Sequence, residues 1–272
     1  VLVTEKQGTT EIPHYMTLFS GLVRKTSQTD TEYDQNGSNN ISKTTTYNYP
    51  TNSPYPSTIT EAIDGTTYLR RVTKFKYAKD FTTTAGTIGL MKTMNILSPV
   101  IEKTIYKDSE SASNVVYSEA KEWQNFTIGS ATKPKPYKFY KWRGSGSFSS
   151  VSENVSTGAL TFDSNYKLQG TINSYDNYGN FPTSITDALG VTTTFQWSDT
   201  YKGAKLTQRG LTINGVPLFQ NYTYNSFHQV EKIIDENSVE TRYEYDGFGR
   251  LVKVVGPAQE TLKEIFYHFK EN

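Results

Sequence analysis

The sequence predicts an all-β protein: repeated antiparallel β-hairpins that form a curved, elongated sheet, as an open strip or partial shell, with at most one short helix. Three observations predict this fold. Turn-forming Asp, Asn and Gly recur between short runs of β-branched and aromatic residues. The 20 tyrosines outnumber the 14 phenylalanines, and a tyrosine can bury its ring while its hydroxyl stays in water. Aromatic–acid–glycine patterns recur every 21 or 22 residues near the C-terminus, which is typical of a repeat protein.

The clearest hairpin covers residues 243–257. Tyr243 and Tyr245 are two positions apart, so both rings project from the same face of an extended strand. Asp246 and Gly249 then define a turn, because Asp can accept a hydrogen bond from the backbone two residues on and Gly adopts positive φ without strain. A β-branched run follows, as a returning strand requires.

The rest of the chain predicts similar elements in order. Residues 1–25 suggest a weak strand followed, over 15–23, by a strand or a short helix. Hairpins are expected for 31–33 with 43–49 about Asn36-Gly37, for 57–61 with 72–77 about Asp64-Gly65, and for 100–106 with 115–123 about a polar loop. Ile88 and Met91 lie at helical spacing, which predicts one short helix over 88–97, ended before Pro99.

Composition divides the chain into three parts. Residues 1–143 form a Tyr- and Thr-rich β region, residues 144–157 include the glycine–serine run 144–147 and form a linker-like loop, and residues 158–272 carry the regular repeats. The expected core residues of the repeats are Ile185, Phe195, Trp197, Val230, Ile233, Tyr243, Tyr245, Leu251, Val254 and Ile265.

The repeats can be aligned by their acids and aromatics. In 187–195 and 235–243 an aspartate precedes the first aromatic by eight positions. Tyr175, Asp176 and Gly179 match the opening of the later hairpin, but one extra residue follows before the next strand. A single insertion reverses the alternation of side chains between the two faces, so we expect a bulge near 181–182.

These residues resemble a known family, the YD or RHS repeats, whose pattern is Tyr-x-Tyr-Asp-x-x-Gly-Arg-Leu. The matching signature residues are Tyr243, Tyr245, Asp246, Gly249, Arg250 and Leu251, and earlier Tyr175, Asp176 and Gly179. The unit from 222 departs from the pattern, with Asn225 in place of Asp and His228 in place of Gly. The Tyr-rich first half is similar to wall-associated RHS proteins of Bacteroidetes-type bacteria.

The resemblance implies a structural function. Members of the family form long β-strips that spiral into a hollow shell, and in toxin-complex relatives the shell encloses a C-terminal toxic domain. It therefore implies a piece of a larger exported, cell-surface or extracellular protein, whose partners are further repeats of the same polypeptide and a C-terminal domain. Unpaired strand edges predict self-association as well.

Residues that could carry chemistry are sparse. The chain has no cysteine and three scattered histidines, at positions 14, 228 and 268, without metal-ligand spacing. We therefore expect no cofactor, no metal and no enzymatic activity. The aspartates at 34, 176, 187, 235 and 246 suit paired acids of a glycosidase, but an acid that recurs in each unit is better explained by its own turn. His228 is likewise explained as a turn residue that tolerates positive φ.

The segment 133–143 is the strongest candidate for ligand contact. It has five basic and four aromatic residues and no acid, and Tyr137, Tyr140 and Trp142 could stack on a sugar or a base. The simpler interpretation is an edge strand whose lysines prevent aggregation. A net charge of +1 argues against nucleic acid as a partner, and no apolar run is long enough to span a membrane. The sequence thus predicts a non-catalytic scaffold, or alternatively a surface module that binds glycans or proteins.

Overall fold

The computed structural model describes residues 2–7, 10–15, 23–37, 40–51, 53–63, 70–198, 200 and 203–267. Over these residues the protein is all-β with a single α-helix, which confirms the predicted fold class. Sixteen strands form the main sheet, in the order β20-β19-β18-β17-β16-β15-β14-β13-β12-β9-β8-β7-β6-β5-β4-β3. Strand order follows the sequence except at β10 and β11, because these two pair with each other. Contacts divide the chain into unit 1, residues 1–75 and 105–110, and unit 2, residues 76–104 and 111–272.

Unit 1 is built of hairpins. Its strands are β1 (Leu2–Gln7), β2 (Thr10–Tyr15), β3 (Ser27–Tyr33), β4 (Asn40–Asn48), β5 (Thr58–Ile63) and most of β6 (Arg70–Tyr77). The predicted Asn36-Gly37 turn is confirmed, since the Gly37 N–H donates to the Asp34 carbonyl at 3.0 Å. The pairings β3–β4 and β5–β6 confirm the two hairpins expected in this unit. The predicted turn at 64–65 and most of the 15–23 segment lie outside the described residues.

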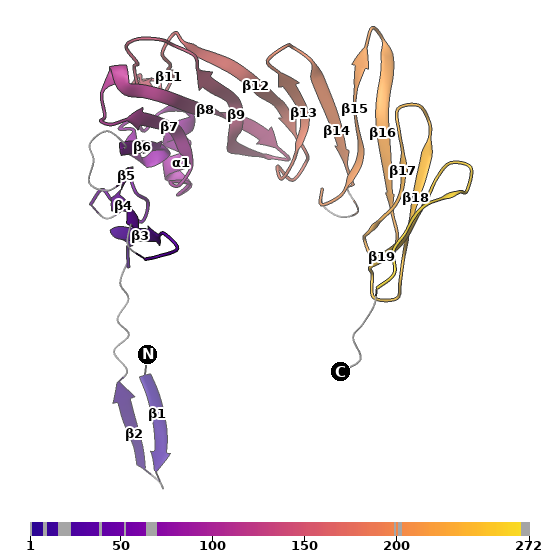
Figure 1. The fold of residues 1–272 in the computed structure, drawn as a ribbon, viewed down its shortest axis with the longest axis horizontal. Helices are drawn as coiled ribbons and strands as arrows, with labels where there is room; N and C mark the ends of the chain where they lie inside the picture. Colours follow the sequence, from indigo (N-terminus) through magenta and orange to yellow (C-terminus); the bar gives the residue numbers. More distant parts are fainter. Residues whose placement is uncertain are drawn as a thin grey trace. The chain divides into compact units, whose positions relative to one another are not determined.

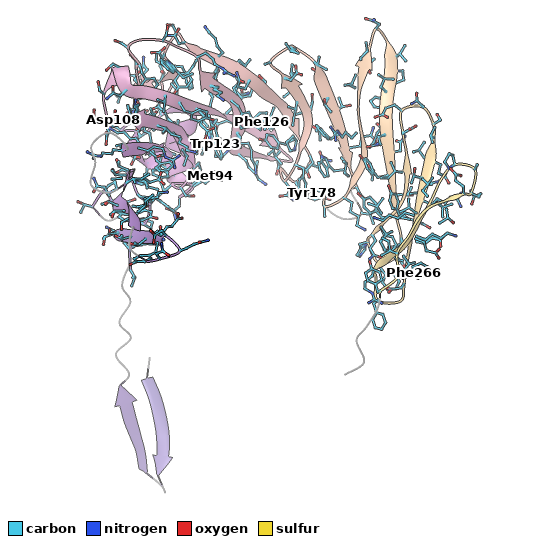
Figure 2. All side chains as sticks on the ribbon, in the orientation of Figure 1. Met94, Asp108, Trp123, Phe126, Tyr178 and Phe266 are labelled. Carbon is cyan, nitrogen blue, oxygen red and sulfur yellow. The ribbon has the colours of Figure 1, made fainter. Side chains whose placement is uncertain are left out.

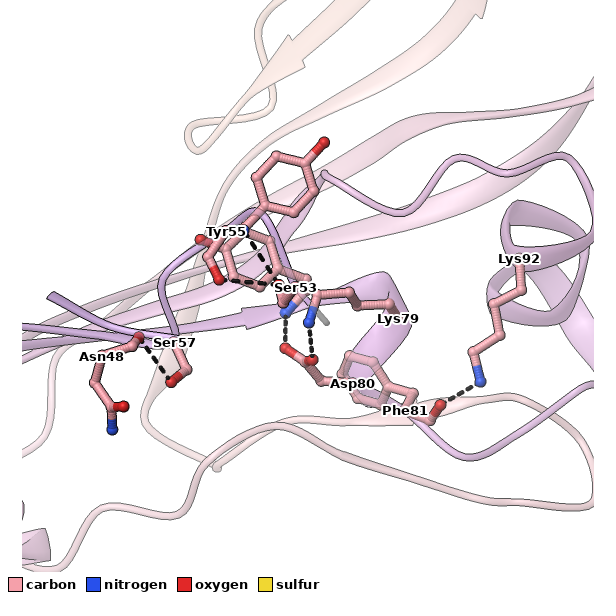
Figure 3. Close-up of polar contacts among 9 residues, drawn as sticks. Asn48, Ser53, Tyr55, Ser57, Lys79, Asp80, Phe81 and Lys92 are labelled. Carbon is pink, nitrogen blue, oxygen red and sulfur yellow. Dashed lines mark hydrogen bonds and ion pairs between the residues drawn. The ribbon is translucent and has the colours of Figure 1, made fainter. Parts of the chain in front are cut away.

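Hydroxyl groups stabilise the loop between β4 and β5 (Figure 3). The Ser57 hydroxyl donates to the Asn48 carbonyl at 3.3 Å, and the Ser53 hydroxyl donates to the Tyr55 carbonyl at 2.9 Å. The Ser53 hydroxyl also accepts the Tyr55 N–H at 3.1 Å. Ser53 is buried, so these bonds satisfy backbone groups that the loop takes out of water.

Unit 2 begins with the end of β6 and contains the protein's packed core. Its first elements are η2 (Ala78–Asp80), α1 (Gly86–Thr93), β7 (Val100–Lys107, with its last residues in unit 1), η3 (Ala112–Asn114), β8 (Val115–Ile128), β9 (Ala131–Trp142), β10 (Ser152–Glu153), β11 (Leu160–Thr161) and β12 (Tyr166–Tyr175). The predicted helix is confirmed, but it starts and ends earlier than 88–97. Asn95, two residues after the end of the helix, adopts a φ of 56°, and a right-handed helix cannot continue through this conformation.

The core lies between α1 and the sheet, not in the repeats. It consists of Ala78, Phe81, Ile88, Met91, Ile101, Ala120, Trp142, Phe148, Val151 and Tyr166. The core residues predicted for the repeats are all only half-buried, so that prediction was wrong. The reason is that α1 covers β8 and β9, and no helix among the described residues covers the strands beyond β12.

Backbone carbonyls anchor α1 to the segment before it (Figure 3). The Lys92 ammonium, in the last turn of α1, donates to the carbonyls of Phe81 and Thr83. Asp80 closes η2, because its carboxylate accepts the Tyr77 N–H at 2.8 Å and the Lys79 ammonium at 2.9 Å. Both contacts fix the turn that brings Ile88 and Met91 onto the sheet.

Two expectations about the middle of the chain need revision. The segment 133–143 is not an edge strand, because β9 pairs with β8 on one side and with β12 on the other. The predicted linker at 144–157 is mostly loop, but Phe148 and Val151 from it are buried in the core. The loop therefore packs as part of unit 2.

The C-terminal part of unit 2 is a run of hairpins (Figure 1). Its strands are β13 (Pro182–Asp187), β14 (Thr192–Trp197), β15 (Leu206–Ile213), β16 (Val216–Tyr224), β17 (Val230–Ile234), β18 (Glu240–Tyr245), β19 (Leu251–Val255) and β20 (Thr261–Glu264). Each pairs antiparallel with the next. No helix in the described part of the chain is long and apolar enough to cross a membrane.

A buried carboxylate organises the polar part of the core. Glu102 is only 4% exposed and accepts the Val151 N–H at 2.9 Å, the Tyr166 hydroxyl at 2.8 Å and the Ser150 hydroxyl. The Tyr166 hydroxyl also lies 2.6 Å from the Ser118 hydroxyl. Burial, together with the nearby Glu102 charge, raises the pKa of Tyr166. These bonds fasten the 144–157 loop to β7, since a buried charge needs several partners.

Replacement of Glu102 by alanine is expected to lower the free energy of unfolding of unit 2 by about 2–4 kcal/mol, because buried donors lose their acceptor. All three tryptophans, Trp123, Trp142 and Trp197, lie in unit 2, so urea unfolding followed by their fluorescence measures the change. Glu264→Ala, at an exposed position of β20, is the control and should change the value by less than about 0.5 kcal/mol. Equal effects of the two variants would contradict a structural role of Glu102.

Candidate functional site

The repeat turns share one hydrogen-bonding pattern. In four of them the side-chain oxygen of the first residue accepts the N–H groups two and four positions later, at 2.8–3.0 Å. The first residues are Asp187, Asn225, Asp235 and Asp246. The fourth residue of each turn adopts a φ between 64° and 83°. These residues are Gly190, His228, Ser238 and Gly249. The acids therefore serve the backbone, as the sequence predicted.

The fourth position explains the glycines of the signature. Gly190 and Gly249 adopt positive φ, where glycine has no steric cost. His228 and Ser238 occupy the same position with φ 70° and 64°. The prediction that His228 is a turn residue with positive φ is confirmed.

The first of the regular turns, 176–181, is one residue longer. The Asp176 N–H donates to the Phe181 carbonyl at 2.9 Å, and the Asp176 carboxylate accepts the N–H groups of Asn180 and Phe181. This turn packs against the β8–β9 hairpin, because a Cβ at Gly179 would lie 2.5 Å from a methyl group of Ile128. Glycine at this position thus allows a close approach as well as a positive φ.

A row of aromatic side chains connects each strand pair to the one before it. In each case a ring hydroxyl or indole N–H donates to a backbone carbonyl of the preceding strand in the sheet, at the first residue of that strand in four cases and within β9 in the fifth. The five bonds are Tyr175 to Pro136 at 2.6 Å, Trp197 to Pro182 at 2.8 Å, Tyr224 to Leu206 at 2.8 Å, Tyr245 to Val230 at 2.8 Å and Tyr267 to Leu251 at 3.0 Å. We call these bonds the aromatic stitches.

Every stitch ends on the residue just before a β-bulge. The pairings skip one residue after each acceptor, and the skipped residues are Tyr137, Thr183, Thr207, Glu231 and Val252. A bulge disrupts the ladder locally, and the carbonyl next to it receives the polar hydrogen of the aromatic side chain. The stitch and the bulge are therefore two parts of one structural unit.

The bulge predicted near 181–182 is confirmed at Thr183, but its predicted cause was wrong. Bulges also follow the turns that contain no extra residue, at Glu231 and Val252. The insertion is accommodated within the longer turn at 176–181 instead. The bulge belongs to the repeat itself.

The stitches also extend the repeat beyond the residues that the sequence indicated. Trp123 pairs with Pro136, which precedes a bulge, as Tyr175 pairs with Pro182. Figure 2 labels Trp123 and Phe126 on β8, and the Phe126 ring lies 5.0 Å from that of Tyr175 in an edge-on contact. Sequence reasoning missed this unit, because the β8–β9 turn at 129–130 has no acid. Tyr267 could have been recognised, since it follows Tyr245 by 22 positions.

Burial makes three of the stitching hydroxyls harder to deprotonate. Burial raises the pKa of Tyr175 to about 12, and burial also raises the pKa of Tyr224 and Tyr245. A tyrosine must keep its proton to donate to a carbonyl. These three hydroxyls therefore remain donors at neutral pH.

The remaining signature residues have structural contacts. The Arg250 guanidinium donates to the Asp246 carboxylate at 2.7 Å and lies over the rings of Phe248 and Tyr267. Hydrogen bonds from the Arg250 backbone and side chain hold the pKa of Asp246 below its usual value. Tyr243 is half-buried on β18.

The aromatics proposed for ligand contact pack against other parts of the protein. Trp142 is 8% exposed, and its ring meets that of Phe148 edge-on. Tyr140 stacks on Phe162 and donates to Glu122 at 2.9 Å. Tyr137 is half-buried beside Phe126. Among the described residues no three acids or histidines come together as metal ligands.

Comparison with known proteins places the repeats in a class of antiparallel hairpin repeat proteins. A family model described as the RHS repeat matches residues 224–261, so these residues carry the RHS repeat that the signature indicated. No curated protein sequence matches the chain. The likeness of the first half to Bacteroidetes-type proteins stays a prediction.

Two crystal structures share the fold. The structure titled TcdB2-TccC3-Cdc42 has a TM-score of 0.51 at 10% sequence identity, over 85% of this chain and 14% of that chain. The structure titled TcdB2-TccC3 has a TM-score of 0.50, also at 10% identity, over 85% and 14%. This chain thus spans about one seventh of the length of either.

Tyr245→Phe is expected to lower the stability of the repeats by about 1 kcal/mol, because it removes one hydrogen bond and no packing. Tyr243→Phe is the matched control, since the Tyr243 hydroxyl has no hydrogen-bond partner among the described residues, and it should have almost no effect. Thermal unfolding followed by far-UV circular dichroism compares the two variants. If they behaved alike, the stitch at Val230 would contribute nothing to stability.

Proposed function

We propose that the chain is a non-catalytic structural repeat module of a larger exported or surface RHS-type protein, in which it forms part of a β-shell or scaffold. The aromatic stitches are the observation that carries this proposal. The hydroxyls of Tyr175, Tyr224 and Tyr245 donate to backbone carbonyls of neighbouring strands, so the tyrosine that recurs in the unit joins one hairpin to the next.

The turn acids support the same function. A glycosidase needs one pair of carboxyl groups held on either side of a substrate bond. The carboxylates of Asp187, Asp235 and Asp246 instead each accept two N–H groups of their own turn. Each carboxylate therefore stabilises the backbone of its own turn, as expected for a residue of a repeated structural element.

The size of the related structures supports a larger parent. This chain spans 14% of each of the two similar chains, and a hairpin repeat is stabilised by its neighbours on both sides. We therefore infer that further repeats of the same polypeptide pair with this sheet. The RHS family implies that the parent is exported or displayed at the cell surface, with a C-terminal domain as the enclosed partner.

The alternative function is a surface module that binds glycans or proteins. The observation that favours it is the exposure of several aromatic rings on the repeats, with Phe227 at 78% and Phe248 at 86%. The rings first considered for this role, Tyr137, Tyr140 and Trp142, pack within the protein instead.

Cryo-electron microscopy of the parent polypeptide tests the scaffold directly. We expect the strands at both ends of this sheet to pair with strands of flanking repeats, around an enclosed space. A parent in which this chain stands alone, with flanking sequence folded as unrelated domains, would overturn the proposal.

A glycan array separates the two functions. The scaffold predicts no binding above background by the purified chain. Binding that is lost in Phe227→Ser with Phe248→Ser, but kept in a Val116→Ser control, would establish the alternative. Val116 is a suitable control because it is exposed on β8, away from the repeat turns.

A further inference from the structure

Each stitch acceptor is preceded in the sequence by a residue that we call the clamp residue. In four of the five units it is the last residue before a strand begins, and in the fifth it lies within β9. In chain order, the clamp residues are Lys135, Phe181, Lys205, Gln229 and Arg250, and the aromatic donors of the same stitches are Tyr175, Trp197, Tyr224, Tyr245 and Tyr267.

Three of the clamp residues are cations that lie over the ring of their own stitch. The distances from the cationic group to the ring centroid are 5.9 Å from Lys135 to Tyr175, 4.6 Å from Lys205 to Tyr224 and 4.5 Å from Arg250 to Tyr267. A ring attracts a cation at such distances, and the attraction is stronger where water is excluded. Lys205 is only 9% exposed. Each cation therefore attracts the ring that the next strand of the sheet contributes.

A ring takes the place of the cation in a fourth unit. Phe181 precedes the acceptor Pro182 and stacks on Trp197, with the ring centroids 4.4 Å apart and the ring planes at 22°. Stacked aromatic pairs are favourable beyond the area that they bury. The clamp position thus calls for a side chain that covers an aromatic ring, and not for one residue type.

Gln229 is the exception among the clamp residues, because it supplies neither a cation nor a ring. Its side-chain N–H donates to the Gly249 carbonyl, and its side-chain carbonyl accepts the Asn225 amide at 3.2 Å. The first and last residues of the turn at 225–229 are therefore joined as a neutral amide pair. The Tyr245 stitch of this unit has a hydrogen bond to Val230 but no charged clamp residue.

The turn at 246–250 has a charged pair at the same two positions. The Arg250 guanidinium donates to the Asp246 carboxylate at 2.7 Å and also lies over the Tyr267 ring. A carboxylate that accepts from a guanidinium restricts where that group can lie. The acid of this turn therefore has a second function besides its backbone contacts, which is to position the clamp residue for the ring of the following strand.

We propose that the clamp residue is the specificity-determining residue of each joint between repeats. A cation or a ring at this position selects and holds the aromatic donor of the next hairpin, and a neutral amide leaves the joint at Tyr245 weaker. The proposal explains part of the basic and aromatic segment 133–143, since Lys135 is a clamp residue. It deepens the proposed scaffold function and rests on it, because it concerns the partner that each hairpin accepts.

Transfer of the charged pair to the exceptional unit tests the proposal as a gain of stability. The variant Asn225→Asp with Gln229→Arg gives the Tyr245 joint a clamp of the Asp246–Arg250 kind. Hydrogen–deuterium exchange of the purified chain should become about threefold slower for the amides of β17 and β18, because the new cation attracts the Tyr245 ring.

The matched control is Asn225→Asp with Ser226→Arg. It adds the same two charges, but it places the guanidinium at an exposed position of the turn, so it should not slow exchange in β17 or β18. An unchanged exchange rate in the Gln229→Arg variant, or equal slowing in the control, would overturn the proposal.

A double-mutant cycle tests the contact between clamp and ring itself. Arg250→Gln should make exchange in β19 and β20 about threefold faster, and this effect should largely disappear in a Tyr267→Leu background, because no ring remains beneath the guanidinium. Far-UV circular dichroism checks that each variant is folded. Equal effects of Arg250→Gln in both backgrounds would mean that Arg250 serves only its own turn, which would overturn the proposal. That result would leave the scaffold function standing, since the architecture of the parent polypeptide decides it separately.

Discussion

The structure depends on one small interaction: the polar hydrogen of an aromatic side chain donated to the carbonyl that precedes a β-bulge. Among the described residues it occurs five times, with donors from Tyr175 to Tyr267. A hairpin alone is marginally stable in water, and within the described part of the chain no helix covers these strands to bury a face. The stitch joins each hairpin to the preceding one and satisfies a backbone group that the bulge has displaced. The need for one such donor in each hairpin explains why aromatic residues recur at regular spacing in this part of the sequence.

Unit 2 combines two ways of stabilising a sheet. Over β7–β12 the sheet is covered by α1 and by the loop that Glu102 fastens, and the interior is apolar. Beyond β12 the side chains are mostly half-buried, and order comes from turns and stitches. The join is made by Tyr175, which contacts Phe126 and donates to Pro136 on the β8–β9 hairpin. Because β8 and β9 carry the same pairing with a bulge, the packed part serves as the first repeat of the strip.

Much of this could be predicted from the sequence, because turn chemistry is local. The Asp246–Gly249 turn, the Asn36-Gly37 turn and the positive φ of His228 follow from the residues themselves. The core could not be located in this way, since burial depends on which strands α1 covers. The position of 133–143 inside the sheet was missed for a similar reason: β12 returns to it after a long interruption. The stitches are also non-local, as their acceptors are carbonyls that no residue type reveals.

Hydrogen–deuterium exchange of Tyr224→Phe tests the central claim most directly. If the stitch from Tyr224 to Leu206 joins the hairpins β14–β15 and β16–β17, the variant should lose amide protection in both of these hairpins, while β8–β9 keeps its protection. Loss confined to the turn at 225–229, or protection equal to that of the wild-type chain, would contradict the claim that these bonds hold the repeats together.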